Sequence, residues 1–317
     1  NRKHLMKNEE QLRNSLSPME ETSLLCLMRP PNFGASSSGY WYQRTPSMAR
    51  SYPPKNHILR HLRLRHLVDG EGNVSASMPI LPDLLDAGGW LRLGAIATLV
   101  DSVAGHHGVM QVEPDWVATL ELGTVIRRRA EGTEVVAECQ PLRIGRNNVV
   151  TETYISDDLG EVARSTCTYA RLPARSDNPT VGTAKGRTVD YASEEEFTNR
   201  PMLNDYLQIE INPERAVIEL PHHSRIHNSF GSIQGGAVAV LVDAMATHLG
   251  SITTGLPMRC LSAEIHYLSQ AKSGPFRVEG ELLRADKDSV TSRVRIIDVG
   301  NNDRLLDIAT ATAKAID

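Results

Sequence analysis

The sequence predicts an α+β protein made of two similar modules in tandem, each a curved antiparallel sheet wrapped around one central helix. The chain has 317 residues, about twice the length of a usual compact domain. Two Ala-rich apolar stretches match each other when Gly94 is placed on Gly236, and each carries one Asp in its middle. Four runs typical of β-strands follow each stretch in the same order. These observations predict an internal repeat of two αβ modules joined in tandem.

The first segment, residues 1–56, is predicted to be an irregular N-terminal extension. It mixes Ser, Pro, Asn and Arg without a sustained apolar period. Met48 is a plausible native start. The segment lacks the apolar stretch and small-residue cleavage site that would indicate secretion. We therefore expect residues 1–47 to be dispensable for folding and activity. The alternative is that the apolar run at 24–28 packs over the functional site as a lid.

The first module is predicted over residues 57–172. A hairpin is expected first, with strands at 58–66 and 74–78 on either side of a polar, Gly-rich turn. The central helix follows at 94–104, where the residues are apolar nearly all round, as in a helix buried on most sides. Four consecutive antiparallel strands are expected after it, at residues 116–126, 133–139, 148–155 and 161–170.

Residues 173–200 are rich in Gly, Ser, Thr and charge, and they are predicted to be a linker with room for one short helix. The second module, residues 201–317, repeats the order of the first. Its hairpin is expected at 206–211 and 216–220, and its helix at 236–246. Its four strands are expected at residues 261–268, 276–283, 290–297 and 305–313.

Composition excludes several classes of protein. Lys plus Arg number 34 against 38 Asp plus Glu, and a formal net charge of -4 does not favour a nucleic-acid partner. Arg, His or Asp interrupts every apolar run before the roughly 18 residues that a membrane helix needs, so no membrane insertion is expected. The four cysteines lie far apart without a CxxC pair. This favours structural thiols in a reducing compartment, and we expect a cytoplasmic protein.

The stretch from His227 to Asp243 carries the clearest motif. It reads HNSFGSIQGGAVAVLVD, with two glycines at the start of the second predicted helix. It resembles the signature of the phenylacetic-acid-type acyl-CoA thioesterases, in which H-N-x-x-G-x-x-H-G-G precedes a helix that contains an Asp. The order of hairpin, buried helix and four antiparallel strands resembles the hotdog fold of that family in both modules. Gln234 stands where the family has His, which removes any role that needs an imidazolium.

The resemblance implies that the two hotdog units pair within one chain as an intrachain pseudo-dimer. They would share a site in which the helix start of one unit faces the helix Asp of the other. One such site would combine Asn228, Gln234 and Gly235 of the second module with Asp101 of the first. The degenerate signature of the first module would build the second possible site. There Asp243 faces Asp86, Arg92 and Leu93, and the signature Gly is missing.

Three further residues are expected at the first of these sites. Thr119 lies on the strand after Asp101, where the family often has a Ser or Thr that helps to place the attacking water. A plain strand Thr is the alternative at that position. Within the signature, Gly236 and His227 are expected to bind substrate.

The residue types themselves favour this chemistry. Glycines at a helix start leave backbone N–H groups and the positive end of the helix dipole open to a ligand, so Gly235 would polarise a thioester carbonyl and stabilise the oxyanion. The structural alternative is that the paired glycines only permit close packing. An Asp inside an apolar helix is costly unless it is hydrogen-bonded, and burial raises its pKa toward that of a base. Asp101 would act as general base or as nucleophile, or it would only tie its helix to the sheet.

We therefore expect an acyl-CoA thioesterase that releases free acid and CoA, with CoA as part of the substrate and no separate cofactor. The alternatives are a non-catalytic acyl-CoA-binding or scaffold protein and an enoyl-CoA hydratase. The hydratase is suggested by the Asp-x4-His spacing of Asp101 with His106 and of Asp243 with His248. The sequence also has two pairs of adjacent histidines, His106-His107 and His222-His223. Adjacent side chains point apart on a regular element, so no metal is expected. The resemblance implies a homodimer of double hotdogs.

Overall fold

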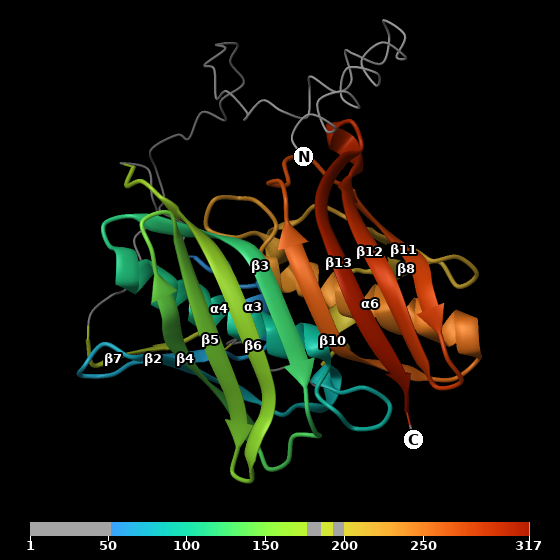
Figure 1. Ribbon diagram of the computed structural model, residues 1–317, viewed down its shortest axis with the longest axis horizontal. Coiled ribbons are helices and arrows are strands. Elements are labelled where there is room, and N and C mark those ends of the chain that lie inside the picture. Colours follow the sequence, from blue (N-terminus) through green and yellow to red (C-terminus); the bar gives the residue numbers. More distant parts are fainter. Residues whose placement is uncertain (1–51, 176–184, 193–199, 317) are drawn as a thin grey trace, which may run out of the picture. The chain divides into compact units, whose positions relative to one another are not determined.

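The structure is a computed structural model that describes residues 52–175, 185–192 and 200–316. Its described strands form one 13-stranded sheet in which all neighbours are antiparallel. Two 20-residue helices, α4 (Leu93–Val112) and α6 (Gly235–Thr254), pack on one face of this sheet and against each other (Figure 1). The predicted α+β class with two sheet-wrapped helices is therefore confirmed.

The first module begins with short elements, which are α3 (Ile58–His61), β1 (Arg65–Val68), β2 (Val74–Pro79) and the 3-10 turn η1 (Pro82–Leu84). After α4 come four long strands, β3 (Trp116–Ile126), β4 (Glu134–Ile144), β5 (Asn148–Asp157) and β6 (Gly160–Leu172). Along β5 and β6, buried residues alternate with more exposed ones, as expected for a sheet with one face on a core. The four strands predicted after the helix are confirmed, each at least as long as the expected range.

The second module repeats this order. It begins with α5 (Leu203–Tyr206), β8 (Glu210–Ile211), β9 (Val217–Leu220) and the 3-10 turn η2 (Ser224–Ile226). After α6 come β10 (Met258–Tyr267), β11 (Phe276–Ala285), β12 (Ser289–Asp298), the 3-10 turn η3 (Val299–Asn301) and β13 (Arg304–Ala315).

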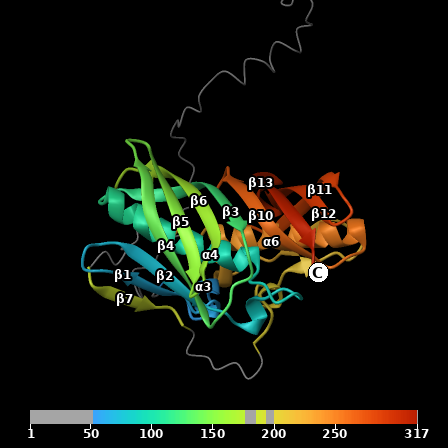
Figure 2. The same ribbon diagram turned by 60° about the horizontal axis from the view of Figure 1, so that its bottom comes forward.

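The two modules join where β3 pairs with β10 at the centre of the sheet (Figure 2). The register of this pair is symmetric, since Glu121 faces His266 and Val125 faces Ser262. The helices approach closely at their N-terminal ends. A Cβ added to Gly94 would lie 2.6 Å from Cα of Val240, and one added to Gly236 would lie 2.6 Å from Cα of Thr98. Close packing is thus the role of one signature glycine, Gly236, and of its counterpart in the first module.

Three expectations for the connecting elements are wrong. Residues 58–61 of the strand expected at 58–66 form the helical turn α3. Of the strand expected at 206–211, only Glu210–Ile211 is strand, and Tyr206 ends the helical turn α5. Each turn places residues in the core, such as Ile58 and Leu59. The predicted linker contains the strand β7 (Arg187–Asp190), which pairs with β1 and covers that edge of the sheet. The predicted extension up to residue 51 and its candidate start, Met48, lie outside the described residues, and the module boundaries stay predictions.

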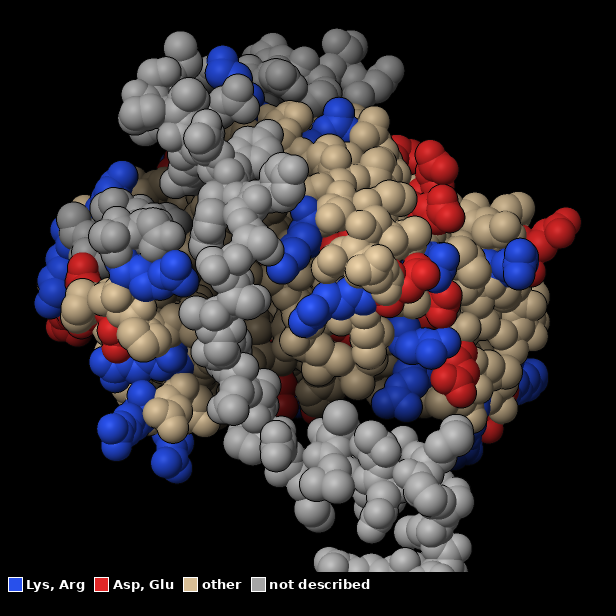
Figure 3. Space-filling model, turned by 90° about the horizontal axis from the view of Figure 1, so that it is seen from above, with Lys and Arg blue, Asp and Glu red and all other residues tan. Residues whose placement is uncertain are grey.

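Among the described helices, α6 is long and apolar enough to cross a membrane by length and composition alone. Of its most apolar window, 72% is buried inside the protein, which is typical of the core helix of a folded domain. On the face shown in Figure 3, Lys and Arg side chains are interspersed with Asp and Glu, as the small net charge predicts.

Candidate active site

Asp101 lies in the middle of α4 and points at the start of α6. Its Oδ2 accepts hydrogen bonds from Nε2 of Gln234 at 3.0 Å and from the backbone N–H of Gly236 at 3.1 Å. Its Oδ1 accepts a hydrogen bond from Oγ1 of Thr119 on β3 at 3.2 Å. The structure therefore brings together five predicted residues from both modules, and we call Asp101, Thr119, Gln234, Gly235 and Gly236 site 1.

Gln234 is the N-cap residue of α6. Its Oε1 accepts the N–H of Ala237 at 3.2 Å while its Nε2 donates to Asp101, so one amide side chain both caps the helix and orients the carboxylate. Among the described residues, the N–H of Gly235 has no acceptor. A Cβ on Gly235 would lie 2.6 Å from Oδ1 of Asp101. A free N–H at the positive end of a helix and a carboxylate therefore lie side by side, which requires glycine.

The environment of Asp101 sets its proton affinity. Burial raises the pKa of Asp101 from 3.8 to about 6, and the hydrogen bonds from Gly236 and Thr119 oppose that shift. At neutral pH the carboxylate of Asp101 is therefore charged, but its charged form is less well stabilised than that of an Asp in water. Such a group accepts a proton readily, as a general base must.

Tyr267 supports site 1 from the sheet. Its hydroxyl, on β10, donates to the carbonyl oxygen of Gly235 at 2.9 Å. This bond holds the first residue of α6 from the side opposite its free N–H. Tyr267 was not predicted as a site residue. The one signal that the sequence offers for it is its place near the end of a predicted strand.

Two other signature residues have different places. Oδ1 of Asn228 accepts the N–H groups of Phe230 and Ser232, both at 3.0 Å, so Asn228 shapes the turn before α6. The ring of His227 lies 4.5 Å from that of His222, and its backbone oxygen accepts a bond from His57. The N–H of Gly236 is occupied by Asp101, which leaves the N–H of Gly235 for a ligand.

The second possible site has the same backbone and different side chains. Asp243 accepts the N–H of Gly94 at 3.4 Å, as Asp101 accepts that of Gly236. Burial raises the pKa of Asp243, while the charge of Arg92 and the Gly94 N–H oppose the shift. Leu93 takes the position of Gly235 and is fully buried, so its side chain covers the helix start. We call Arg92, Leu93, Gly94, Asp243 and Cys260 site 2.

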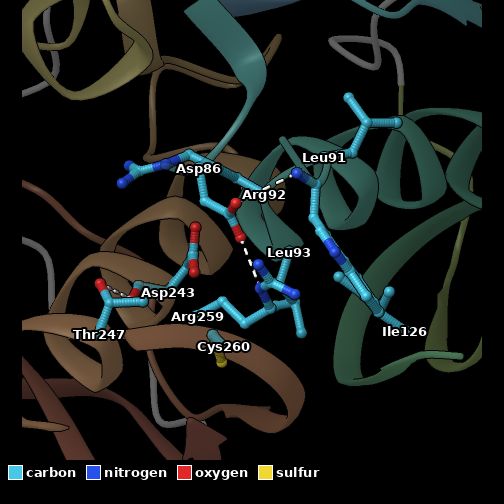
Figure 4. Close-up of a pocket in the computed structure, with 10 residues that line it drawn as sticks. Asp86, Leu91, Arg92, Leu93, Ile126, Asp243, Thr247, Arg259 and Cys260 are labelled. Atoms are coloured by element: carbon cyan, nitrogen blue, oxygen red, sulfur yellow. Dashed lines mark hydrogen bonds and ion pairs between the residues drawn. The ribbon is translucent and has the colours of Figure 1, made fainter. Parts of the chain in front are cut away.

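A buried ion pair fills the space beside site 2 (Figure 4). Nε of Arg259 donates to Oδ2 of Asp86 at 2.9 Å, and the guanidinium lies 4.3 Å from the ring centroid of Trp90. Asp86 also accepts the N–H groups of Gly88 and Trp90, so it shapes its turn as Asn228 does, and its charge adds to the raised pKa of Asp243. A Cβ on Gly88 would collide with the Arg259 guanidinium. The cavity that remains holds about 10 Å³, room for one water.

The strand residues beside the two acids also differ. The β-bulge in β3 follows Thr119 and the one in β10 follows Cys260, which makes these two residues counterparts. Thr119 donates to Asp101, whereas Sγ of Cys260 lies 3.5 Å from the oxygen of Ser262. One residue earlier, Ala118 of site 1 corresponds to Arg259. The ion pair of Arg259 was not predicted from the sequence, because its partner Asp86 is far away in the chain.

The histidines that suggested a hydratase lie elsewhere. Nδ1 of His106 lies 3.3 Å from Nδ1 of His66, and His248 bonds the carbonyl of Arg215. In the described part of the chain, no three His, Cys, Asp or Glu side chains gather where they could hold a metal ion.

Comparison with known proteins finds similarity to thioesterases. Residues 230–303 match the family described as the Thioesterase superfamily. The proofreading thioesterase EntH of Klebsiella pneumoniae is 27% identical over 129 residues, which are 40% of this chain and 92% of that protein.

Solved structures show the same fold. The TesB protein of Mycobacterium avium subsp. paratuberculosis has a TM-score of 0.55 at 9% identity, over 76% of this chain and 92% of that chain. An acyl-ACP thioesterase from Bacteroides thetaiotaomicron has a TM-score of 0.52 at 11% identity, over 76% of this chain and 97% of that chain. The described modules thus have the tandem hotdog fold, and residues 230–303 of the second are similar to the thioesterase superfamily.

Proposed function

We propose that the protein is an acyl-CoA thioesterase of the phenylacetic-acid type that hydrolyses its substrate at site 1. The observation that carries this proposal is the free N–H of Gly235 directly beside the buried carboxylate of Asp101. The thioesterase superfamily match and the similarity to EntH support the reaction class. The competing hypothesis is a protein that binds acyl-CoA without cleaving it.

In the proposed reaction, the thioester carbonyl oxygen accepts the N–H of Gly235 at the start of α6. The helix dipole and this N–H stabilise the negative charge that develops on that oxygen during attack. A donor of this kind commonly contributes about 3–4 kcal/mol to transition-state stabilisation. Gln234 has no imidazolium to offer, so it orients Asp101 and caps the helix through its amide.

The carboxylate of Asp101 takes part in the reaction by one of two routes. As general base, it takes a proton from a water that attacks the carbonyl carbon. As nucleophile, it attacks the carbonyl itself and forms a mixed anhydride that water then hydrolyses. In both routes the C–S bond breaks, the thiolate of CoA leaves and takes up a proton, and the acyl group leaves as free acid. Thr119, Gln234 and Gly236 hold the two carboxylate oxygens in place.

A panel of acyl-CoA substrates tests the proposal. Thiol release is measured for short, medium and long aliphatic and for aromatic acyl groups, and binding of each is measured by calorimetry. The proposal expects turnover of at least one acyl class. Binding without thiol release by the wild-type protein would support the non-catalytic alternative.

A further inference from the structure

Tyr267 and Asp307 form a polar pair beneath the start of α6. They are direct cross-strand neighbours on β10 and β13, and the hydroxyl of Tyr267 donates to Gly235 of site 1. Burial, then the charges of Asp101 and Asp307, raise the pKa of Tyr267 well above its usual range. Asp307 therefore lies within electrostatic reach of the group that holds Gly235.

The internal repeat shows where this pair lies. The β-bulges make Thr119 the counterpart of Cys260, and counting along the strands from there makes Ile126 the counterpart of Tyr267. Ile126 is the cross-strand neighbour of Ala163, just as Tyr267 is of Asp307. Since Ile126 lines the small cavity of site 2, Tyr267 borders the equivalent position in site 1, and Asp307 lies beside Tyr267 on the next strand.

Asp307 has no structural partner that would explain an acid at this position. It is 2% exposed, and no hydrogen bond to its carboxyl group is recorded among the described residues. Burial raises its pKa well above the usual range, and its buried Oδ2 has no hydrogen-bond partner among the described residues. An unpartnered polar group in a protein interior is costly, and the first module folds with Ala163 in its place.

We propose that Asp307 is a specificity-determining residue that binds a hydroxyl group on the acyl part of the substrate. A hydroxyl group can donate a hydrogen bond to a carboxyl oxygen, which is the partner that the buried Oδ2 of Asp307 lacks. A site built to hydrogen-bond a substrate hydroxyl rejects the analogue without it, because the buried group is then left unpaired. The inference rests on the proposed thioesterase function and adds the class of acyl group to it.

The test compares hydroxylated acyl-CoAs with their deoxy analogues. Suitable pairs are 3-hydroxybutyryl-CoA with butyryl-CoA and 4-hydroxyphenylacetyl-CoA with phenylacetyl-CoA, which place the hydroxyl at different distances from the thioester. For the pair that fits, wild type should show a kcat/KM at least about tenfold higher for the hydroxylated member. Asp307→Asn keeps a donor and an acceptor and should keep most of the preference. Asp307→Leu should remove it.

Thermal unfolding separates this role from a structural one. Asp307→Leu should leave Tm unchanged or raise it, because it removes an unpartnered polar group. Asp298 is the matched control, since it is equally buried in the same sheet but accepts three backbone N–H groups, from Lys272, Ser273 and Gly274. Asp298→Leu should lower Tm.

The outcomes distinguish the two proposals. Absence of thiol release from every acyl-CoA would overturn the proposed function and this inference with it. Hydrolysis with equal kcat/KM within each pair, or a preference that Asp307→Leu retains, would overturn only the role of Asp307, as would a lower Tm of Asp307→Leu. A water would then be the natural partner of the acid.

Discussion

Site 1 and site 2 have the same backbone and opposite prospects for catalysis. In each, a buried Asp on one long helix accepts an N–H from the second residue of the other helix. In each, a turn shaped by Asn228 or Asp86 leads into that helix start. The comparison teaches that the hotdog pairing supplies the acid and the helix end twice, whereas a few neighbouring side chains decide whether a substrate reaches them.

Three exchanges separate the sites. Gly235 leaves a helix N–H open, and Leu93 covers the equivalent one. Thr119 orients Asp101, whereas Cys260 makes no recorded bond to Asp243. Ala118 stands in site 1 at the position that Arg259, with its ion pair to Asp86, takes in site 2. We expect one working site per chain.

The largest expected difference between the sites is in the two acids. Asp101→Asn should lower kcat by about 10²–10⁴-fold, because a carboxamide neither takes up a proton nor attacks the carbonyl at a useful rate. Asp243→Asn should leave kcat close to that of wild type. Steady-state thiol release with purified variants checks both, and the reverse ranking would show that the sites are assigned the wrong way round.

The helix start of site 1 comes next. In Gly235→Ala the new Cβ would lie 2.6 Å from Oδ1 of Asp101, so carbonyl and carboxylate can no longer share that space. We expect kcat/KM to fall by about 10²–10³-fold, the usual effect of losing one oxyanion donor. Gly105→Ala is the control, because a Cβ there has no neighbour within 4 Å. Equal activity of the two variants would contradict the role of Gly235.

The ion pair of site 2 should matter for stability alone. Arg259→Ala leaves Asp86 buried without its cation, which typically costs about 3–5 kcal/mol of unfolding free energy. The activity of the folded fraction should be unchanged. Urea unfolding measures the loss, and adding Asp86→Asn should recover part of it, because the amide keeps the turn acceptor without the charge. A double variant as unstable as the single one would argue against the ion pair.

The smallest expected effect is on the pH dependence. The pKa of Asp101 is raised to about 6 in the folded protein, so kcat/KM should fall as pH decreases below about 6 and the carboxylate takes up a proton. The stability effect has the opposite sign. The folded state binds this proton more tightly than the unfolded chain does. The contribution of protonated Asp101 to the free energy of unfolding is therefore fully present below pH 3.8 and is lost as pH rises through about 6.

Two measurements check the pH dependence. A pH–rate profile gives the activity limb, and thermal unfolding from pH 4 to 7 in wild type and Asp101→Asn gives the stability difference. An acid limb well below pH 5 would mean that Asp101 is not the group that limits activity.

Much of this comparison could be predicted from the sequence, because its signals are local. The repeat of two apolar helices gave the tandem fold, and the run HNSFGSIQGG placed Gln234 and Gly235 at a helix start. The pairing of these residues with Asp101 came from the family resemblance and agrees with the observed hydrogen bonds. The helical turns at residues 58–61 and 203–206 were not predictable in this way, because four residues are too few for a period to appear.

Long-range contacts explain what the sequence did not show. Arg259 meets Asp86 only because β10 lies beside the start of α4, and nothing near either residue marks a pair. Tyr267 and Asp307 are likewise joined only by the pairing of β10 with β13. Asn228 shows a different limit. Its position in the motif was clear, but only the structure shows that its side-chain oxygen bonds the turn.

The most direct test of a single working site is the number of substrate molecules that bind per chain. Asp101→Asn is titrated by calorimetry with the acyl-CoA that wild type hydrolyses fastest, so that binding is measured without turnover. We predict one molecule per chain, and loss of that binding when Gly235→Ala is added. Two molecules per chain, or a single one that survives Gly235→Ala, would contradict the assignment of catalysis to site 1.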